Sequence, residues 1–514
     1  MLRIQQKQLN LYSDIYSRIP ENHVLKQIDK VVCFSFVNEL LADSYCTNFG
    51  RPAKEPEMMV KLLLLQKLYN LSDEDVIEES GLNLAYMYFL GINPDDDLPH
   101  PSLLSKFRNL RLKDTDLDDM LCEIARQCVE KGIIEAKNGI TTDTTHILAN
   151  TTKKVPERIM KHLARRIFKA MKQTDYDIPD YTQIENHKEA KQVMKDFLEE
   201  TIEKAMTTAD ESVRESVQKE TELAKEILSS PLFIEQKGIR SLVDTDARVG
   251  YKSKTESFFG YKAEISQTTK EGIITAVGVH NGAYVDGTDF GKFYKLSKVI
   301  GIDIKAFYGD KAYFKQHILG PLKTDNVKAY IPVSASSYRI DEELYSYNKD
   351  SDRWICVQGN MTMSKKHKVS KRKDIGEYKF YEYTFAKEGC IDCPRREECI
   401  KKAKTKSKKL QVSLNTAEYY EHSQWANTEE FKEEYKKRSA SEWKNAELKR
   451  FHGLDRACGY GLKSVNCQAK LTAISVNLKR IAKLTALKVI HFPMNMQAVR
   501  QREGNVLFFD LAAA

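Results

Sequence analysis

The sequence lacks the features that define several protein classes. Its most apolar run, MMVKLLLLQKLYNL at residues 58–71, is interrupted by Lys61 and Lys67, so it is too short between charges to span a membrane. The amino terminus contains no continuous apolar segment of the kind found in secretory signal peptides. The formal net charge is only +8, and a surplus this small does not by itself indicate a nucleic-acid partner. These absences favour a cytoplasmic protein without a membrane segment.

The eleven histidines form no ligand cluster, and most of the ten cysteines are scattered along the chain. Scattered cysteines in a long chain are typical of reduced thiols in the cytoplasm. One group differs. The stretch CIDCPRREEC holds Cys390, Cys393 and Cys399, with Cys356 upstream. Four thiols that include one close pair could hold a structural Zn²⁺ ion, although buried free thiols would explain the same residues equally well.

A chain of 514 residues is too long for one hydrophobic core, so we expect several domains. Residues 1–125 show a helical pattern, with Ser72 and Ser102 as candidate N-caps. The helix after Ser102 would expose four basic residues, which are Lys106, Arg108, Arg111 and Lys113. Short helices that end in a basic helix suit a helix-turn-helix DNA-binding module. A plain helical bundle with a solvated basic face is the alternative, and periodicity alone favours it.

The middle of the chain alternates between strands and helices. The β-branched segment GITTDTTHILAN at residues 139–150 predicts a strand around Asp143. Residues 153–235 are helical and highly charged, which indicates an inserted arm. A hairpin, a helix and the strand IKAFYGD follow, the last ending at Asp310, with a helix expected directly after it at 311–322. This order predicts an α/β sheet with helices packed on it.

Residues 336–426 break this pattern, because they are rich in strand signals and positive charge. They indicate a second insertion, which contains the cysteine group. Residues 427–485 are helical again. Within them, YKKRSASEWKNAELKR places four residues on one helical stripe, at offsets of 3, 7 and 14: Tyr435, Arg438, Glu442 and Lys449. A surface helix in which Arg438 and Glu442 form an ion pair would explain part of this stripe.

Three acids stand out against this organisation. Asp143 and Asp310 lie in or after predicted neighbouring strands, and Glu442 lies on the polar stripe. The carboxyl ends of neighbouring strands converge on one crevice in an open α/β sheet, and a helix across that crevice could add a third carboxylate. Three close carboxylates repel one another unless cations lie between them. Hard oxygen ligands favour Mg²⁺ or Mn²⁺, and two such ions can support phosphodiester cleavage.

These residues carry a resemblance to a known family. The spacing Tyr, two residues, Arg, three residues, Glu, six residues, Lys resembles the late helix of DDE-type insertion-sequence transposases, and Tyr435, Arg438, Glu442 and Lys449 match it at every position. FYGDKAY and ITTDTT resemble the segments around the family's two aspartates. Further similar segments are DTDARVGYKSKTESFFGYKAEI, AELKRFHGLDRACGYGL and the N-terminal KLLLLQKLYNLSDEDVIEES.

The resemblance implies a fold and a chemistry. The fold would be an RNase H-like α/β catalytic core at 126–335 and 427–490, a helical DNA-binding domain at 1–125 and an insertion at 336–426. Asp143, Asp310 and Glu442 would ligate two Mg²⁺ (or Mn²⁺) ions. Tyr435, Arg438, Lys449, Lys311, Arg108 and Tyr313 are the residues expected to contact DNA, Arg108 because it lies on the basic helix.

The same resemblance implies that the protein cleaves element ends and joins the freed 3′-hydroxyl to target DNA. Its partners would be double-stranded DNA and a second copy of the chain assembled on DNA, in the cytoplasm and at the nucleoid. Two alternatives stay open from the sequence: a metal-dependent nuclease that cuts without joining, and a catalytically inactive DNA-binding repressor.

Overall fold

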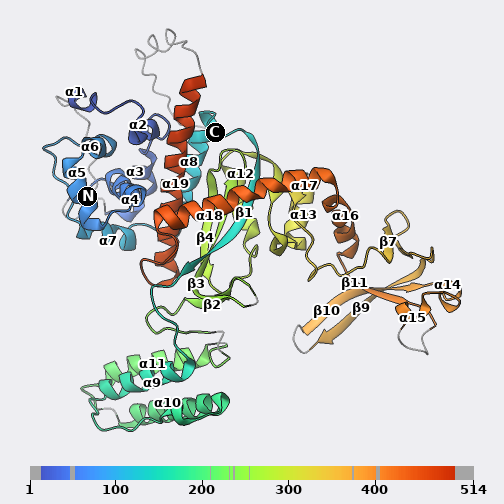
Figure 1. Ribbon diagram of the computed structural model, residues 1–514. Coiled ribbons are helices and arrows are strands. Elements are labelled where there is room, and N and C mark those ends of the chain that lie inside the picture. Colours follow the sequence, from blue (N-terminus) through green and yellow to red (C-terminus); the bar gives the residue numbers. More distant parts are fainter. Residues whose placement is uncertain are drawn as a thin grey trace.

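The computed structural model describes residues 13–46, 52–208, 210–230, 232–235, 238–253, 255–372, 376–400 and 406–491 (Figure 1). It is a mixed α/β protein with one central sheet. Among the described residues, no helix is both long and apolar enough to cross a bilayer. Two excursions leave the sheet region, a helical one and a strand-rich one, and both return to it (Figure 1).

The central sheet has the order β2-β3-β1-β5-β6, with β4 also paired to β3. β3 runs antiparallel to β1, β2 and β4, whereas β5 runs parallel to β1 and β6 parallel to β5. The strands are β1 (Lys137–Leu148), β2 (Arg248–Tyr251), β3 (Ser257–Thr268), β4 (Ile274–Asn281), β5 (Asp303–Tyr308) and β6 (Lys328–Tyr330). The predicted α/β sheet, including the hairpin β3–β4, is therefore confirmed.

The helices within this region are α12 (Phe290–Val299), η3 (Lys311–Tyr313) and α13 (Gln316–Thr324). The sequence predicted one helix over 311–322, and this is wrong in detail. The chain makes a single 3₁₀ turn after Asp310, and α13 begins only at Gln316 because Phe314 and Lys315 have non-helical backbone angles. Phe314 is fully buried, which fits a side chain that anchors this break.

The N-terminal region is helical, as predicted. Its elements are α1 (Ser13–Tyr16), α2 (Val24–Asp29), α3 (Phe36–Leu40), η1 (Ala42–Ser44), α4 (Pro56–Tyr69), α5 (Asp73–Leu82), α6 (Leu84–Leu90), α7 (Ser102–Leu110) and α8 (Asp114–Glu130). Ser72 caps α5 in a reciprocal capping box with Asp75. Ser102 is not a cap, because it is the first residue of α7 and its hydroxyl contacts His100 instead.

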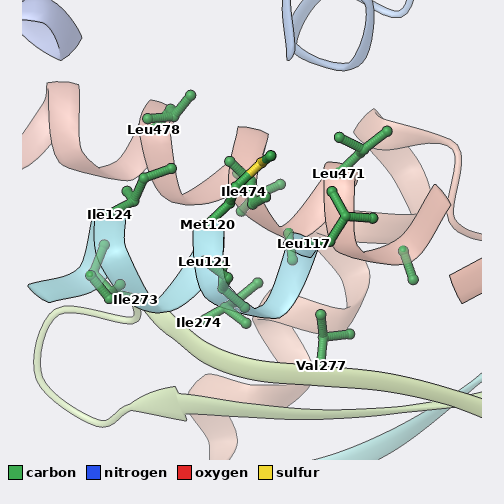
Figure 2. Close-up of a cluster of buried hydrophobic side chains, with 14 of the residues drawn as sticks. Leu117, Met120, Leu121, Ile124, Ile273, Ile274, Val277, Leu471, Ile474 and Leu478 are labelled. Atoms are coloured by element: carbon green, nitrogen blue, oxygen red, sulfur yellow. The ribbon is translucent and has the colours of Figure 1, made fainter. Parts of the chain in front are cut away.

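These helices share one apolar core with the sheet. The long helix α19 (Gly461–His491) lies between them, so that its Leu471 and Ile474 meet Met120 of α8 and Ile274 of β4 (Figure 2). The helix α8 itself crosses the predicted domain boundary at residue 125. The boundaries of the three predicted domains stay predictions, but burial joins the first of them to the sheet.

The start of α19 explains one of the recognised sequence segments. Asp244 and Asp246 belong to DTDARVGYKSKTESFFGYKAEI, and their carboxylates accept hydrogen bonds from the backbone N–H groups of Gly461 and Leu462 at 3.3 and 2.8 Å. Acids at a helix N-terminus satisfy unpaired donors and complement the helix dipole. This segment therefore fixes α19 against the sheet.

The helical excursion connects β1 to β2. It consists of α9 (Pro156–Ala170), α10 (His187–Thr208) and α11 (Arg214–Ser229), with a short 3₁₀ turn η2 (Tyr181–Gln183). Apolar residues of α9 recur at helical spacing, and they meet the other two helices in a separate apolar cluster: Ile159, Met160, Leu163, Ala164, Ile167, Phe168, Met194, Leu198, Ile202, Ala205, Val217, Ala224 and Ile227. The predicted helical arm is thus a three-helix bundle with its own core.

The strand-rich excursion follows β6 and is the predicted insertion. β11, β10 and β9 form one antiparallel sheet and β7 and β8 form a second, smaller one. Its elements are β7 (Tyr345–Asn348), β8 (Arg353–Cys356), β9 (Thr362–Arg372), β10 (Gly376–Phe385), α14 (Glu388–Ile391), α15 (Arg396–Cys399) and β11 (Lys409–Ser413). The chain then returns through α16 (Thr416–Ala426) and α17 (Glu429–Tyr435) to the 3₁₀ turn η4 (Lys436–Arg438) and α18 (Ser439–His452).

Candidate active site

Strand register brings Asp143 and Asp310 to the same place. Thr141 of β1 is aligned with Tyr308 at the end of the parallel strand β5. Two residues beyond this aligned pair lie Asp143 and Asp310, one on each strand path. Neighbouring strands are about 4.8 Å apart, and side chains two residues apart share a face. The two aspartates therefore flank one another at the carboxyl edge of β5.

The turn after β5 orients Asp310. Its carboxylate accepts a hydrogen bond of 2.8 Å from the backbone N–H of Ala312, which makes it the N-cap of η3. A capping aspartate has one oxygen committed to the backbone and keeps acceptor capacity for other partners. The turn thus holds this carboxylate toward β1.

Asp143 lies in a mostly enclosed position, with 15% of its side chain exposed. The pKa of Asp143 is raised to about 6, chiefly by burial; the charge of Arg438 opposes this rise, and the negative charges of Asp310 and Glu442 contribute to it. A carboxyl with a raised pKa is one that gains from a nearby cation. The three acids that sequence reasoning selected are therefore close enough to act on one another electrostatically.

The helix that carries the polar stripe is interrupted. α17, η4 and α18 follow one another without a break in right-handed backbone, but Lys436–Arg438 form a 3₁₀ turn between the two α-helices. Tyr435 ends α17, Arg438 lies in the turn, and Glu442 lies in the first turn of α18. The expected single α-helical stripe is thus corrected to a helix with an overwound turn inside its motif.

Arg438 is the cation among the acids. Its Nη1 donates to Oε1 of Glu442 at 2.8 Å, and its Nη2 lies 3.8 Å from Oδ1 of Asp143. Its Nε is buried and faces no acceptor among the described residues. The ion pair between Arg438 and Glu442, which the sequence left as an alternative, is present. It coexists with the convergence of the acids.

Asn445 and Lys449 tie the same helix to β1. The side-chain amide of Asn445 donates to Oδ2 of Asp143 at 3.0 Å. Lys449 Nζ lies 3.2 Å from Nδ1 of His146, and burial lowers the pKa of Lys449 to about 8. Burial also lowers the pKa of His146 to about 4, so this imidazole is a neutral acceptor. Beyond the helix, Arg456 donates to the carbonyl of Ala149 at 3.0 Å and closes the contact.

A second, buried network lies beneath the aspartates. Glu264 of β3 is fully buried and accepts hydrogen bonds from the hydroxyls of Tyr284 and Tyr313, at 2.6 and 2.8 Å. Tyr313 also lies 3.2 Å from the hydroxyl of Thr144, the residue after Asp143. Burial raises the pKa of Glu264. These residues link β1, β3 and the turn at Asp310, and they hold that turn in place.

Sequence reasoning missed Asn445 and Glu264, for different reasons. Asn445 continues the polar stripe three residues after Glu442, so the same helical spacing could have found it. Glu264 lies in GYKAEISQ, an ordinary alternating strand pattern. Nothing in that pattern distinguishes a buried acid from one that faces solvent.

Two residues predicted to contact DNA have hydrogen-bond partners within the protein, and their roles toward DNA stay predictions. Arg108 donates from both terminal nitrogens to the carboxylate of Asp73, with Nη1 at 2.8 Å from Oδ1. This bidentate pair joins α7 to α5, so Arg108 has a structural partner where the sequence predicted an exposed cation. Tyr313 is 1% exposed and bonded to Glu264, so its hydroxyl also has a partner within the protein. Lys311 is exposed beside Asp310, and its role stays a prediction.

The donor set suits a hard divalent cation, because it consists of carboxylate oxygens. As the side chains stand, no three His, Cys, Asp or Glu residues in the described ranges are arranged to hold a metal ion together. The Glu442 carboxylate, whose side chain is 62% exposed, is instead paired with the guanidinium of Arg438. A divalent cation in the place of the Arg438 guanidinium would face the same two carboxylates, Asp143 and Glu442.

Comparisons with known proteins bear on the two ends of the chain. Residues 13–110 match a family model described as "Transposase domain (DUF772)". Residues 355–482 match a family model described as "Transposase DDE domain". This range includes α17, η4 and α18, which together form the motif helix that carries Tyr435, Arg438, Glu442 and Lys449. A third model, described as "ERp29, N-terminal domain", matches residues 230–340, a segment that forms β2 to β6 of the central sheet.

No curated protein matches the chain. A solved structure described as a cryo-EM structure of the piggyBac transposase synaptic complex with hairpin DNA is 10% identical, covers 95% of this chain and 86% of its own, and has a TM-score of 0.27. A TM-score this low supports no inference about the fold. The two transposase family models, at residues 13–110 and 355–482, confirm that the chain resembles the DDE-type transposases.

Proposed function

We propose that this protein is a DNA transposase that cleaves the ends of a mobile element and joins the freed 3′-hydroxyl to target DNA. The observation that carries the proposal is the convergence of Asp143, Asp310 and Glu442, which come from segments far apart in the sequence, beside Tyr435 and Arg438. The sheet order β4-β3-β1-β5-β6, with β5 and β6 parallel to β1, supports an RNase H-like core.

In this proposal the three carboxylates would hold Mg²⁺ or Mn²⁺. Bound divalent ions would activate the attacking oxygen and stabilise the leaving oxygen of a phosphodiester. The chain's own residues prepare the site. Asp310 is oriented by its capping bond to Ala312, and Asp143 by the amide of Asn445. Glu442 completes the set when Arg438 releases it.

Arg438 would change partners on binding DNA. In the free protein it neutralises the acids, and its buried Nε has no acceptor among the residues described. A phosphate oxygen beside the scissile bond would supply that acceptor, since guanidinium groups bind phosphates through several N–H donors. Tyr435 ends α17 just before Arg438, Lys449 lies on α18 just after it, and exposed Lys311 lies beside Asp310. We expect these cations and the phenol to line the DNA path.

The substrate would be double-stranded DNA, at element ends and at the target site, in the cytoplasm and at the nucleoid. Because two ends must be paired before joining, we expect at least a homodimer assembled on DNA. The oligomer is tested by sizing the protein with and without a DNA end. A monomer on a cleaved and joined product would contradict this part of the proposal.

The deciding experiment incubates the purified protein with Mg²⁺, a labelled element end and a target plasmid. Joined product supports transposition, cleavage without joining supports a nuclease, and binding without cleavage supports a DNA-binding repressor. The last two outcomes would each overturn the proposal.

Variants at the acids sharpen this test. Glu442→Gln and Asp310→Asn are expected to lower cleavage by about 10³-fold or more, because each removes a charge needed only in the reaction, while end binding stays largely intact. Glu433→Gln and Asp303→Asn are matched controls, since both acids are exposed on the same elements or their neighbours. Normal cleavage by Glu442→Gln would show that the metal assignment is wrong.

Replacing Arg438 with Ala is expected to weaken DNA binding and to lower the slope of log K against log salt by about one unit, the value for one phosphate contact. Binding constants measured at several salt concentrations check this. An unchanged slope would show that Arg438 serves only the acids.

A further inference from the structure

The four cysteines of the insertion line one small cavity. Cys356 ends β8, Cys390 lies in α14, Cys393 follows α14 and Cys399 ends α15. The cavity between them has a volume of about 30 Å³, and Cys356, Cys390, Cys393 and Cys399 are all among its lining residues. None of the four forms a disulfide. A space of this size holds one water-sized or ion-sized guest.

We propose that this cavity is a structural zinc site with Cys356, Cys390, Cys393 and Cys399 as its ligands. Four thiolates around one small space are the ligand set of closed, tetrahedral zinc sites. The remaining cysteines lie outside the insertion. The site is independent of the proposed DNA chemistry, because it lies in a separate excursion of the chain.

The surroundings of the thiols suit a charged metal–thiolate centre. The amide nitrogen of Asn360 lies 3.3 Å from Sγ of Cys390, where it can donate to a thiolate. Arg396 and Lys408 also line the cavity, and they donate to the backbone carbonyls of Cys390 and Cys399 at 2.8 and 2.9 Å. Cationic groups and N–H donors around the sulfurs stabilise their deprotonated form.

Zinc binding requires a rearrangement of the cysteine side chains. As the side chains stand, the described residues contain no group of three His, Cys, Asp or Glu set to hold a metal. The hydroxyl of Tyr345 lies 4.0 Å from Sγ of Cys399 on one wall, so this sulfur faces the wall. A tetrahedral site would require the four cysteine side chains to turn their sulfurs into the cavity that they line, to meet zinc at about 2.3 Å.

The insertion has a physical need for such a centre. Its own apolar cluster is small: Tyr345, Trp354, Tyr383, Phe385, Cys390, Leu410 and Val412. One of the four proposed ligands, Cys390, belongs to this cluster. The short helices α14 and α15 have four residues each, which is below the length that is stable without tertiary contacts. A metal that bridges β8 to both helices would fix them.

The test uses the full-length protein produced with zinc in the medium. We expect about one zinc per chain by atomic emission, and release of that zinc by a thiol-modifying reagent. Cys393→Ser and Cys356→Ser, both partly exposed positions, should lower the zinc content at least tenfold. Cys33→Ser and Cys458→Ser, at exposed cysteines outside the insertion, should keep it.

A second measurement keeps the proposal falsifiable if a variant fails to fold. The wild-type protein is stripped of metal and titrated with Cd²⁺, whose thiolate complexes absorb in the ultraviolet. Saturation at one Cd²⁺ per chain supports the site. A protein that binds neither ion, or a Cys393→Ser variant that keeps its full zinc content, would overturn it.

Discussion

The helical arm and the cysteine insertion occupy equivalent places in the chain and are built on different principles. The arm lies between Asp143 and Asp310, and the insertion lies between Asp310 and Glu442. The arm has a continuous apolar core of its own, whereas the insertion has a small aromatic cluster and four cysteines around a cavity. One excursion is stabilised by burial, and we infer that the other also needs a metal.

The difference shows how acids that are far apart in sequence can share a site. Each excursion has an apolar cluster of its own and returns to the central sheet region, which leaves Asp143, Asp310 and Glu442 close enough to interact. The insertion is also connected to the motif helix. Trp354 packs against Tyr420 of α16, at a ring distance of 5.6 Å, and Phe431 of α17 stacks on Tyr435 at 5.8 Å.

Removal of zinc should produce the largest effect and should separate the two excursions. Structural zinc sites contribute on the order of 10 kcal/mol to folding of the domains that contain them. A zinc chelator is therefore expected to increase amide hydrogen exchange in residues 345–399 greatly, with α9 to α11 unchanged. An equal increase in hydrogen exchange in both excursions would contradict the proposal that only the insertion depends on zinc.

Leu163→Ala should have the converse effect. Leu163 is fully buried in the core of the arm, and deletion of a buried leucine side chain costs about 2–5 kcal/mol. Hydrogen exchange should rise in α9 to α11, and zinc content and DNA cleavage should stay normal. Val155→Ala, at a half-exposed position before α9, is the control. Loss of cleavage in Leu163→Ala would show that the arm is not self-contained.

Asp143→Asn tests the site that lies between the two excursions. The pKa of Asp143 is raised to about 6, so the folded state binds this proton more tightly than the unfolded chain does. Ionising Asp143 in the folded protein lowers the free energy of unfolding. This loss of stability is absent below the ordinary carboxyl pKa and reaches its full size above pH 6. The variant should therefore be more stable than the metal-free wild type by about 1–2 kcal/mol at pH 8 and equally stable near pH 4.

Denaturant unfolding of both proteins at the two pH values, without divalent ions, measures this difference. Asp303→Asn, at an exposed aspartate that pairs with Lys305, is the control. Cleavage by Asp143→Asn should be abolished. A variant that is less stable at pH 8 would mean that Asp143 is held charged by Arg438.

The smallest expected effect concerns the surface of the arm. Arg158, Arg165 and Lys169 are exposed on one side of α9. Replacing them with Gln should lower the salt slope of DNA binding by about 0.9 for each phosphate group that they neutralise in the wild-type complex. Lys188→Gln and Lys219→Gln, on α10 and α11, are the controls. If the α9 variants and the control variants have the same salt slope, the basic residues of α9 face solvent and do not contact DNA phosphates.

Most of the fold could be predicted from local patterns. Alternating apolar residues and turn signals located β1, β3 and β4, and helical spacing located the arm. The sharing of one core between the N-terminal helices and the sheet could not be predicted, because it depends on α19 packing on both (Figure 2). A buried helix has apolar residues on several sides, and its sequence does not say which neighbour each side meets.

The site was predictable to the extent that spacing encodes it. The stripe on the motif helix, the aspartate within one predicted strand and the aspartate after another were visible, and in the structure Asp143 interacts electrostatically with Asp310 and Glu442. The partners of Arg108 and Tyr313 were not visible, since Asp73 and Glu264 lie far from them in sequence. A basic or phenolic side chain looks the same in sequence whether its partner is a phosphate or a buried carboxylate.

The 3₁₀ turn at Lys436–Arg438 is a point at which the motif helix can change its twist and length. A residue in a 3₁₀ turn advances about 2.0 Å and 120°, against about 1.5 Å and 100° in an α-helix. If these three residues became α-helical when DNA arrives, Tyr435 would swing by about 60° around the axis relative to Glu442 and the helix would shorten by about 1.5 Å. One screw-like motion would thus shift Arg438 relative to Glu442 and loosen their ion pair.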